Sequence, residues 1–231
     1  MIYVTSDLHG CAPEVLFGLL ESAGFSQEDY LFILGDVVDR GEHGVELLRW
    51  IAEQPNVELI LGNHEAMLLS CDFVFEELTE ESLSKMDTEK MELLDTWLSN
   101  GALPTVKGLC KLMKHAPEIL AGILEFLWDA PLYDVVEVAG RTYILVHAGF
   151  ENFDPKKSLD SYDPRELLWA RPTLDTKYFE KATVVFGHTP TGLFGSPGKM
   201  VKTDSWICID TGAAMGKKPM LLRLDDEKAF Y

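Results

Sequence analysis

The sequence has few cysteines and contains no pattern that would join them. Its 231 residues include four, at positions 11, 71, 110 and 208, with no CxxC pair and no dense spacing among them. Cysteines scattered in this way are typical of reduced thiols that pack in a protein interior. We therefore expect neither a disulfide framework nor a zinc site made of thiolates.

Long hydrophobic runs are also missing. No segment approaches the length of a membrane span, and no basic stretch precedes a short apolar one near the N-terminus. The first apolar run, Met1 to Val4, leads directly to Asp7, and a cleavable signal would remove this motif. We expect a cytoplasmic protein with no membrane partner.

Basic residues are scarce relative to acidic ones. The chain has 20 Lys and Arg against 38 Asp and Glu, which gives a formal net charge of -18. Such a surface repels nucleic acid and anionic membranes, so we expect no nucleic-acid partner. An anionic substrate would have to be attracted locally, by metal ions and a few arginines. The composition does not indicate an oligomeric state.

Five short apolar runs each end at residues of the types that ligate metals. They are rich in Val, Ile, Leu and aromatic residues without polar alternation, which is typical of strands buried on both faces. Amphipathic segments at 14–23 and 44–53 favour helices between the early runs. This order predicts an α/β fold with polar chemistry at the strand ends. The runs are 2–10, 30–41, 57–65, 142–149 and 183–190.

Residues from about 66 to 131 interrupt this order. The acidic, amphipathic stretch 72–95 predicts helices with one solvated face, followed by a loop around 100–105 and a helix at 116–128. We expect 1–231 to form one domain that carries this helical insertion. Strands are expected again at 132–138 and 141–146, flanking a turn at Ala139 and Gly140, and at 205–209 and 220–224.

Each motif at a strand end is weak evidence when it stands alone. A DxH pair can be a turn and helix cap, and a lone histidine beside an apolar strand is usually a core residue. Together, however, the strand ends supply oxygen and imidazole donors that could converge on one edge of the sheet. This mixture suits Mn²⁺, Fe²⁺ or Zn²⁺. The expected ligands are Asp7, His9, Asp36, Asn63, His147 and His188.

Two metal ions at close separation require a bridging carboxylate, and Asp36 is the natural bridge. One ion would take Asp7, His9 and Asp36, whereas the other would take Asp36 with the remaining three ligands. A water molecule held between two such ions loses a proton near neutral pH and becomes a nucleophile.

The motifs GDVVDRG (35–41) and GNHE (62–65) can supply the other groups that phosphate chemistry needs. Arg40 offers a planar fork that matches phosphate oxygens, with a structural salt bridge as the alternative. His64 could donate a proton to the departing oxygen, and Asp39 could orient its imidazole.

At these motifs the chain resembles the metallophosphoesterase superfamily, and within it the phosphoprotein phosphatase family, in particular its small bacterial and phage serine/threonine phosphatases. The resemblance runs through SDLHG (6–10), GDVVDRG, GNHE, HAG (147–149), LLWARP (167–172) and VVFGHTP (184–190). TWLSNGALPT (96–105) resembles a W-x-x-N-G-G-x-x-T stretch of these enzymes, with Ala102 in place of the second glycine.

The resemblance implies a four-layer α/β/β/α sandwich and a dinuclear metal site that is usually activated by Mn²⁺, with Fe²⁺ and Zn²⁺ as alternatives. It assigns the six ligands named above, His64 as general acid with Asp39 as its partner, and Arg40 as a phosphate ligand. Arg171 matches a second phosphate-binding arginine. That role rests on the resemblance alone.

The sequence therefore favours a metal-dependent phosphoric monoester hydrolase, a serine/threonine phosphatase acting on a phosphorylated protein or a small phosphoester. A symmetrical dinucleoside tetraphosphate hydrolase is the alternative. Those hydrolases usually lack an acid at the position of Asp39, and they have GNHD where this chain has GNHE. A third alternative, an inactive relative that binds phosphorylated partners, conflicts with the complete set of expected ligands.

Overall fold

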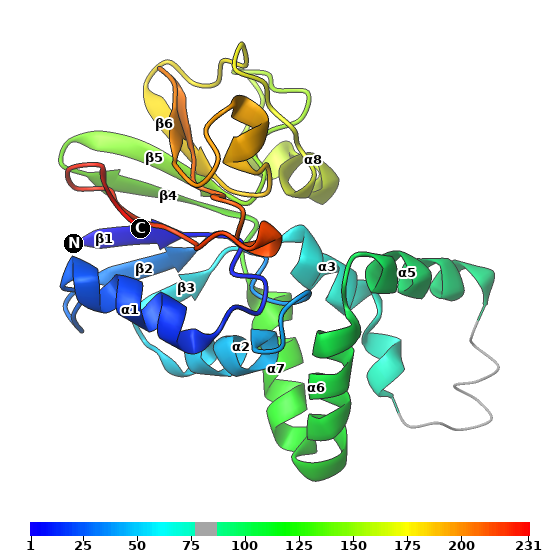
Figure 1. The fold of residues 1–231 in the computed structure, drawn as a ribbon. Helices are drawn as coiled ribbons and strands as arrows, with labels where there is room; N and C mark the ends of the chain where they lie inside the picture. Colours follow the sequence, from blue (N-terminus) through cyan, green and yellow to red (C-terminus); the bar gives the residue numbers. More distant parts are fainter. Residues whose placement is uncertain (77–86) are drawn as a thin grey trace.

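The computed structural model describes residues 1–76 and 87–231, and two five-stranded sheets form its centre (Figure 1). The first sheet has the order β10-β9-β1-β2-β3, and the second has the order β4-β5-β6-β8-β7. The strands of the first are β1 (Ile2–Thr5), β2 (Tyr30–Ile33), β3 (Val57–Leu59), β9 (Leu221–Arg223) and β10 (Lys228–Phe230). Those of the second are β4 (Tyr133–Val138), β5 (Arg141–Val146), β6 (Ala182–Phe186), β7 (Val201–Lys202) and β8 (Trp206–Cys208).

Both sheets are mixed, with parallel strands at their centres. In the first, β2 pairs in parallel with β1 and β3, while β9 and β10 continue the sheet in antiparallel pairing. In the second, β6 pairs in parallel with β5 and β8, and β4 joins β5 through the expected turn at Ala139 and Gly140. Parallel strands end at a common edge, so the residues that follow them are brought together there.

Alternating side chains divide the interior into layers. Tyr3 packs with helix residues on the outer face of the first sheet, whereas Val4 lies in the cluster that joins the two sheets. From the second sheet, Leu145 belongs to the same central cluster, and Ile144 faces a third cluster beneath Leu167. Two mixed sheets flanked by helices are consistent with the α/β/β/α sandwich that the sequence predicted.

The helices follow the expected pattern closely. Helix α1 spans Pro13–Ala23 and α2 spans Gly44–Glu53, and both bury an apolar stripe against the first sheet. The region of the expected insertion contains α3 (Asn63–Ser70), a 3-10 turn (Asp72–Phe75), α5 (Thr88–Ser99), α6 (Leu103–His115) and α7 (Pro117–Asp129). Figure 1 shows α5, α6 and α7 projecting to one side of the sheets.

Three expectations need correction or limits. The predicted loop around 100–105 is shorter, because α6, a helix that the sequence analysis did not predict, begins at Leu103 with Pro104 in its first turn, where proline is readily accommodated. Part of the helical stretch expected at 72–95 falls on residues 77–86, which lie outside the described residues. The sequence analysis also did not predict the short elements α8 (Pro164–Leu168), β7 and β10.

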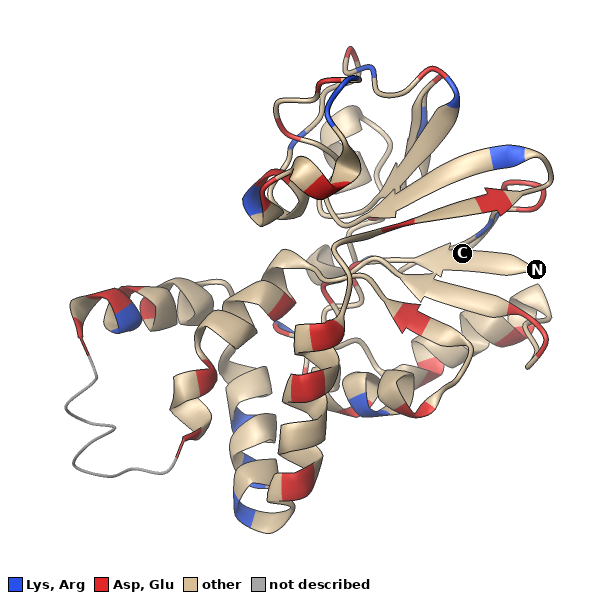
Figure 2. Cartoon of the chain, turned by 180° about the vertical axis from the view of Figure 1, so that it is seen from behind, with Lys and Arg blue, Asp and Glu red and all other residues tan. Residues whose placement is uncertain are grey.

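The charged positions are distributed over the whole fold. Acidic residues lie on the outer helices, on strands and in loops of both halves (Figure 2). Within the described part of the chain, no helix combines the length and apolar character needed to cross a bilayer.

Candidate active site

Residues that follow the carboxyl ends of strands in both sheets form one buried cluster. Asp7 and His9 follow β1, Asp36 follows β2, and Asn63 opens α3 just after β3. His147 comes directly after β5, and His188 comes two residues after β6. All six side chains that we expected to ligate metals are buried. The structure therefore brings them together from five separate segments.

One group of donor atoms gathers around the amide oxygen of Asn63. Its Oδ1 lies 2.8 Å from Nε2 of His147 and 2.9 Å from Nδ1 of His188. Nε2 of His147 is also 3.4 Å from Oδ1 of Asp36. Because Nδ1 of His147 donates to the carbonyl oxygen of Leu34 at 2.7 Å, its Nε2 carries a lone pair. This group could hold one cation.

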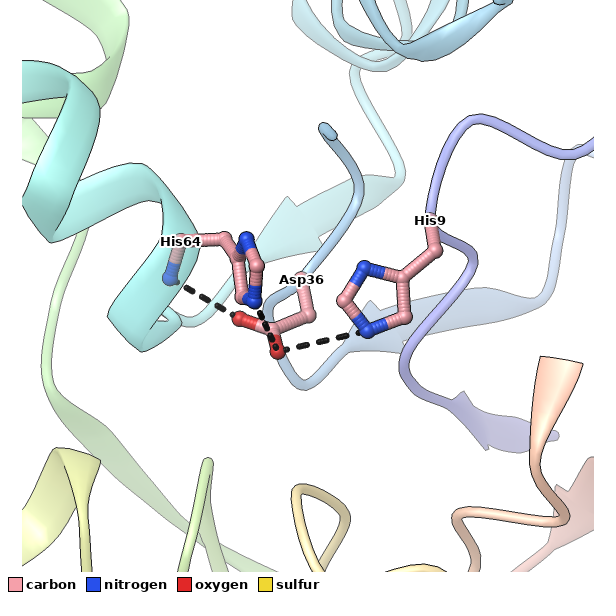
Figure 3. A group of neighbouring side chains, drawn as sticks. All are labelled: His9, Asp36 and His64. Carbon is pink, nitrogen blue, oxygen red and sulfur yellow. Dashed lines mark hydrogen bonds and ion pairs between the residues drawn. The ribbon is translucent and has the colours of Figure 1, made fainter. Parts of the chain in front are cut away.

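A second group lies at the other oxygen of Asp36. Nε2 of His9 is 3.6 Å from Oδ2 of Asp36 (Figure 3). The same nitrogen is 4.0 Å from Oδ1 of Asp7. Nδ1 of His9 contacts the carbonyl oxygen of Val38 at 3.3 Å, which again leaves Nε2 as the acceptor. The two carboxylate oxygens of Asp36 thus face two different donor groups, as a bridging ligand requires.

His64 also approaches the second group, since its Nε2 lies 3.9 Å from Oδ2 of Asp36. By distance alone it could complete that group as a ligand instead of acting as an acid. Its Nδ1, however, is bound to Oδ2 of Asp39 at 2.7 Å, so only Nε2 faces the cleft.

The backbone around the cluster is unusual. Six of the expected site residues adopt the left-handed conformation that side chains normally avoid, and such strain is characteristic of functional sites. Two glycines allow the loops to approach closely: a Cβ at Gly10 would overlap the backbone of Gly41, and one at Gly187 would overlap the carboxylate of Asp7. The six left-handed residues are Asp7, His9, Asp36, Asp39, Arg40 and His188.

Burial determines the charge of these groups. It lowers the pKa of His9 to about 2, of His147 to about 3 and of His188 to about 2, so the imidazoles are neutral at neutral pH. Burial also raises the pKa of Asp7 and of Asp36, with mutual repulsion of the two carboxylates as the next contribution for Asp36.

This donor set fits a pair of divalent cations. Neutral imidazoles have the lone pairs that metal ions need, and the crowded buried carboxylates require positive charge for compensation. Carboxylate, amide and imidazole donors without a thiolate do not select one metal, so its identity is not shown. The residues of the cluster could hold two ions that share Asp36.

Arginines and an aromatic side chain line the cleft above the cluster. Arg40, Asn100, Trp169 and Arg171 form part of its walls. Nη1 of Arg40 is 3.2 Å from Nε2 of His9, and its Nη2 is at the same distance from Nε2 of His64. The guanidinium is therefore placed where it can reach a phosphate group bound at the cluster.

Sequence reasoning gave no role to two acidic residues of the site. Glu65, the last residue of GNHE, is fully buried and accepts backbone N–H bonds from Asp36, Val37, Val38 and Gly62. Asp210 lines the cleft, and burial raises its pKa to about 6. The acid in GNHE was the only available signal for Glu65, because backbone partners cannot be read from a sequence.

Comparisons with known proteins identify a family for this chain. Residues 1–212 match the family model described as calcineurin-like phosphoesterase. A symmetrical bis(5'-nucleosyl)-tetraphosphatase of Nitrosospira multiformis is 27% identical over 99% of this chain and 94% of its own length. One of the same name from Aromatoleum aromaticum is 26% identical over 99% of this chain and 95% of its own length.

Solved structures share the fold. A protein described as a proposed diadenosine tetraphosphatase superposes with a TM-score of 0.65 at 18% identity, covering 99% of this chain and 90% of the other. A protein serine/threonine phosphatase of Saccharomyces cerevisiae gives 0.60 at 15% identity, covering 99% and 79%.

Proposed function

This chain belongs to the calcineurin-like phosphoesterase family, and on that premise we propose that it is a two-metal phosphohydrolase, with a dinucleoside tetraphosphate as its first candidate substrate. The observation that carries the proposal is the position of Asp36. Its Oδ1 lies near His147 and its Oδ2 near His9, so one carboxylate serves two groups of donors. We propose Mn²⁺ as the metal, because the donors are compatible with it and the enzymes that the sequence resembles are usually activated by it.

The remaining residues have distinct tasks in this proposal. When bound, the two ions neutralise phosphate charge and lower the pKa of a water molecule that attacks phosphorus. Arg40 and Arg171 bind the phosphate oxygens that point away from the cluster. His64, held through Nδ1 by Asp39, presents Nε2 to the leaving oxygen and gives it a proton as the P–O bond breaks.

The relatives support the dinucleotide substrate. The curated proteins of this name match nearly the whole of both chains. This finding favours what the sequence analysis treated as the alternative. Cleavage of such a substrate releases a nucleoside phosphate, whose leaving oxygen is already weakly basic.

A phosphomonoester in a protein is the second candidate, and the contact of His64 with Asp39 favours it. An alkoxide leaving group, such as that of serine, is strongly basic and departs only with a proton. A buried His-Asp pair that supplies this proton is therefore most useful for a monoester. Its presence here, at 2.7 Å, is the observation that retains this candidate.

The deciding experiment compares both substrates with one preparation. Purified protein loaded with Mn²⁺ is assayed on diadenosine tetraphosphate and on a phosphoserine peptide, with EDTA-treated protein and the Asp36→Asn variant as controls. We expect hydrolysis that depends on metal and on Asp36, with the larger kcat/KM for the dinucleotide. A larger kcat/KM for the peptide assigns the second candidate, and inactivity on both refutes the phosphohydrolase proposal.

A further inference from the structure

Two residues of the helical insertion reach the partner of the proposed general acid. Nε1 of Trp97, on α5, donates to Oδ2 of Asp39 at 2.9 Å, and Oγ1 of Thr105, on α6, donates to Oδ1 at 2.6 Å. The hydroxyl of Thr105 in turn accepts the backbone N–H of Asp39 at 2.9 Å. Trp97, Thr105 and Asp39 are all buried.

The turn between α5 and α6 fixes this arrangement. The carbonyl oxygen of Gly101 accepts the backbone N–H of Arg40 at 2.8 Å, so the turn is docked on the segment that carries Asp39. Gly101 has a φ of 96°, and a Cβ there would press against the side chain of Arg40. The spacing of W-x-x-N-G-x-x-x-T thus places Trp97 and Thr105 on opposite sides of one docked turn, each facing the same carboxylate.

The hydrogen bonds leave Asp39 a single orientation. Oδ2 is shared between Trp97 and Nδ1 of His64, while Oδ1 is taken by Thr105. Rotation of the carboxylate would break both contacts with the insertion in a buried environment, where unpaired polar groups are costly. Because Nδ1 donates to this carboxylate, Nε2 is the ring nitrogen that faces the cleft, 3.2 Å from Nη2 of Arg40. A protonated His64 would therefore release its proton from Nε2.

We propose that Trp97 and Thr105 are positioning residues for proton transfer, through which the helical insertion aims His64 at the leaving oxygen. This proposal rests on the phosphohydrolase function above. In the step concerned, the P–O bond to the leaving group breaks, its electron pair goes to the leaving oxygen, and the Nε2 proton of His64 neutralises that oxygen. The need for this proton increases with the basicity of the leaving group.

The alternative is that both residues only fill the core. Trp97 also packs against Phe75, and a large indole at the base of an insertion needs no catalytic role to be buried. The two readings differ in one measurable respect. A purely structural role changes the activity on all substrates by the same factor, whereas a positioning role affects substrates with basic leaving groups most.

The test uses Trp97→Phe, which keeps a ring but removes the donor, and Thr105→Val, which keeps the shape but removes the hydroxyl. Each is assayed as the full-length, Mn²⁺-loaded protein on 4-nitrophenyl phosphate, phenyl phosphate and a phosphoserine peptide. Since general acid catalysis contributes about 10²–10⁴-fold, we expect kcat to fall roughly tenfold on the peptide and less than about twofold on 4-nitrophenyl phosphate. KM should change little, and Thr105→Ser should restore the rate.

Matched controls come from the same insertion. Trp128→Phe removes an exposed indole at the end of α7, and Thr96→Val removes an exposed hydroxyl beside Trp97. Both should behave as the unmodified protein. Calorimetric titration with Mn²⁺ should give unchanged binding for all variants, because the ligands themselves are untouched.

The outcomes separate this inference from the proposed function. If the unmodified protein hydrolyses these esters but the two variants lose activity equally on all three, the positioning role is refuted. If the unmodified protein hydrolyses a dinucleotide but none of these esters, its substrates need no such proton and the positioning role is refuted. If it hydrolyses neither the esters nor a dinucleotide, the phosphohydrolase proposal itself fails. Should Trp97→Phe not fold, Thr105→Val and its serine counterpart still decide the question.

Discussion

The carboxylate of Glu65 accepts the backbone N–H of Asp36 at 2.7 Å through Oε2. Its other oxygen accepts the N–H groups of Val37 at 2.8 Å and Val38 at 3.2 Å. A left-handed residue, Asp36, is therefore held by a buried side chain from the neighbouring motif. The position of the bridging carboxylate depends on this contact.

We expect Glu65→Gln to weaken metal binding. In the unmodified protein both carboxylate oxygens of Glu65 accept backbone N–H groups, whereas the glutamine amide would place its own N–H groups against some of these donors. Loss of such a supporting contact typically costs about 10–100-fold in metal affinity. Calorimetric titration with Mn²⁺ measures it, with Glu53→Gln at the exposed end of α2 as the control. Unchanged affinity in Glu65→Gln would show that Asp36 is positioned without this residue.

The sequence predicted the convergence of the ligands because parallel strands end at a common edge. It could not predict which atoms hold them there. The support that Glu65 gives to Asp36 depends on backbone N–H groups, which carry no residue-specific signal. Trp97 and Thr105 stood in a recognised motif, but their common partner became visible only once α5 and α6 were placed beside Asp39.

Short elements were the other limit of sequence reasoning. Strand β7 has two residues and β10 has three, too few for a recognisable alternation. Helix α6 was also missed as a separate element, and its first residues were taken for a loop, since the stretch from Leu103 to Thr105 combines Pro and a β-branched residue. Long apolar runs were predicted well because burial of both faces leaves a continuous hydrophobic pattern.

The two proposed metal positions should respond differently to loss of Asp36 and of Asp7. Asp36→Asn removes charge from a carboxylate that faces both donor groups, so we expect both positions to bind more weakly. The carboxylate of Asp7 lies 4.0 Å from Nε2 of His9, whereas its contact with His188 is to the backbone N–H, so Asp7→Asn should weaken mainly one position. Equilibrium dialysis with metal analysis gives the stoichiometry. Normal activity together with two bound ions in Asp36→Asn would contradict the bridging assignment.

His64→Asn should retain both metal ions and lose turnover. If His64 is the proton donor, kcat falls by about 10²-fold or more for basic leaving groups, with KM changed little. Metal analysis of the purified variant provides the second measurement. A variant that has lost one ion would show instead that His64, which lies 3.9 Å from Oδ2 of Asp36, serves as a ligand.

Asp210 should make the stability of the metal-free protein depend on pH. Burial raises its pKa to about 6 from an ordinary value of 3.8, so the folded chain binds this proton more tightly than the unfolded chain. The stabilising contribution is complete below the unfolded pKa and is lost as the pH rises through the folded one. The full cost is about 3 kcal/mol, from about 1.4 kcal/mol per unit of pKa, and most of it develops between pH 4 and 7.

The variant Asp210→Asn removes this cost while its amide oxygen can still accept the backbone N–H of Gly212. In EDTA, we therefore expect the variant to gain stability over the unmodified protein at pH 7 but not at pH 4. Urea unfolding at both pH values measures the difference. Asp204→Asn, at an exposed position, should show no such trend. An equal effect of Asp210→Asn at both pH values would contradict the shifted pKa.

The two cleft arginines should be tested by conservative replacement, because their proposed role depends on shape as well as charge. A guanidinium binds two phosphate oxygens through parallel N–H groups, whereas an ammonium acts as a point charge. Arg171→Lys should therefore raise the inhibition constant of inorganic phosphate, by roughly tenfold for the loss of one charge-assisted hydrogen bond. Arg40→Lys should do the same.

Arg165→Lys, on α8 and exposed, supplies the matched control and should bind phosphate normally. The comparison also tests the one residue whose role rests on resemblance. If Arg40→Lys weakens phosphate inhibition and Arg171→Lys does not, Arg171 lines the cleft without binding the phosphate group, and Arg40 alone supplies the fork. Equal effects in both variants mean that both guanidinium groups bind the phosphate, as the resemblance implies.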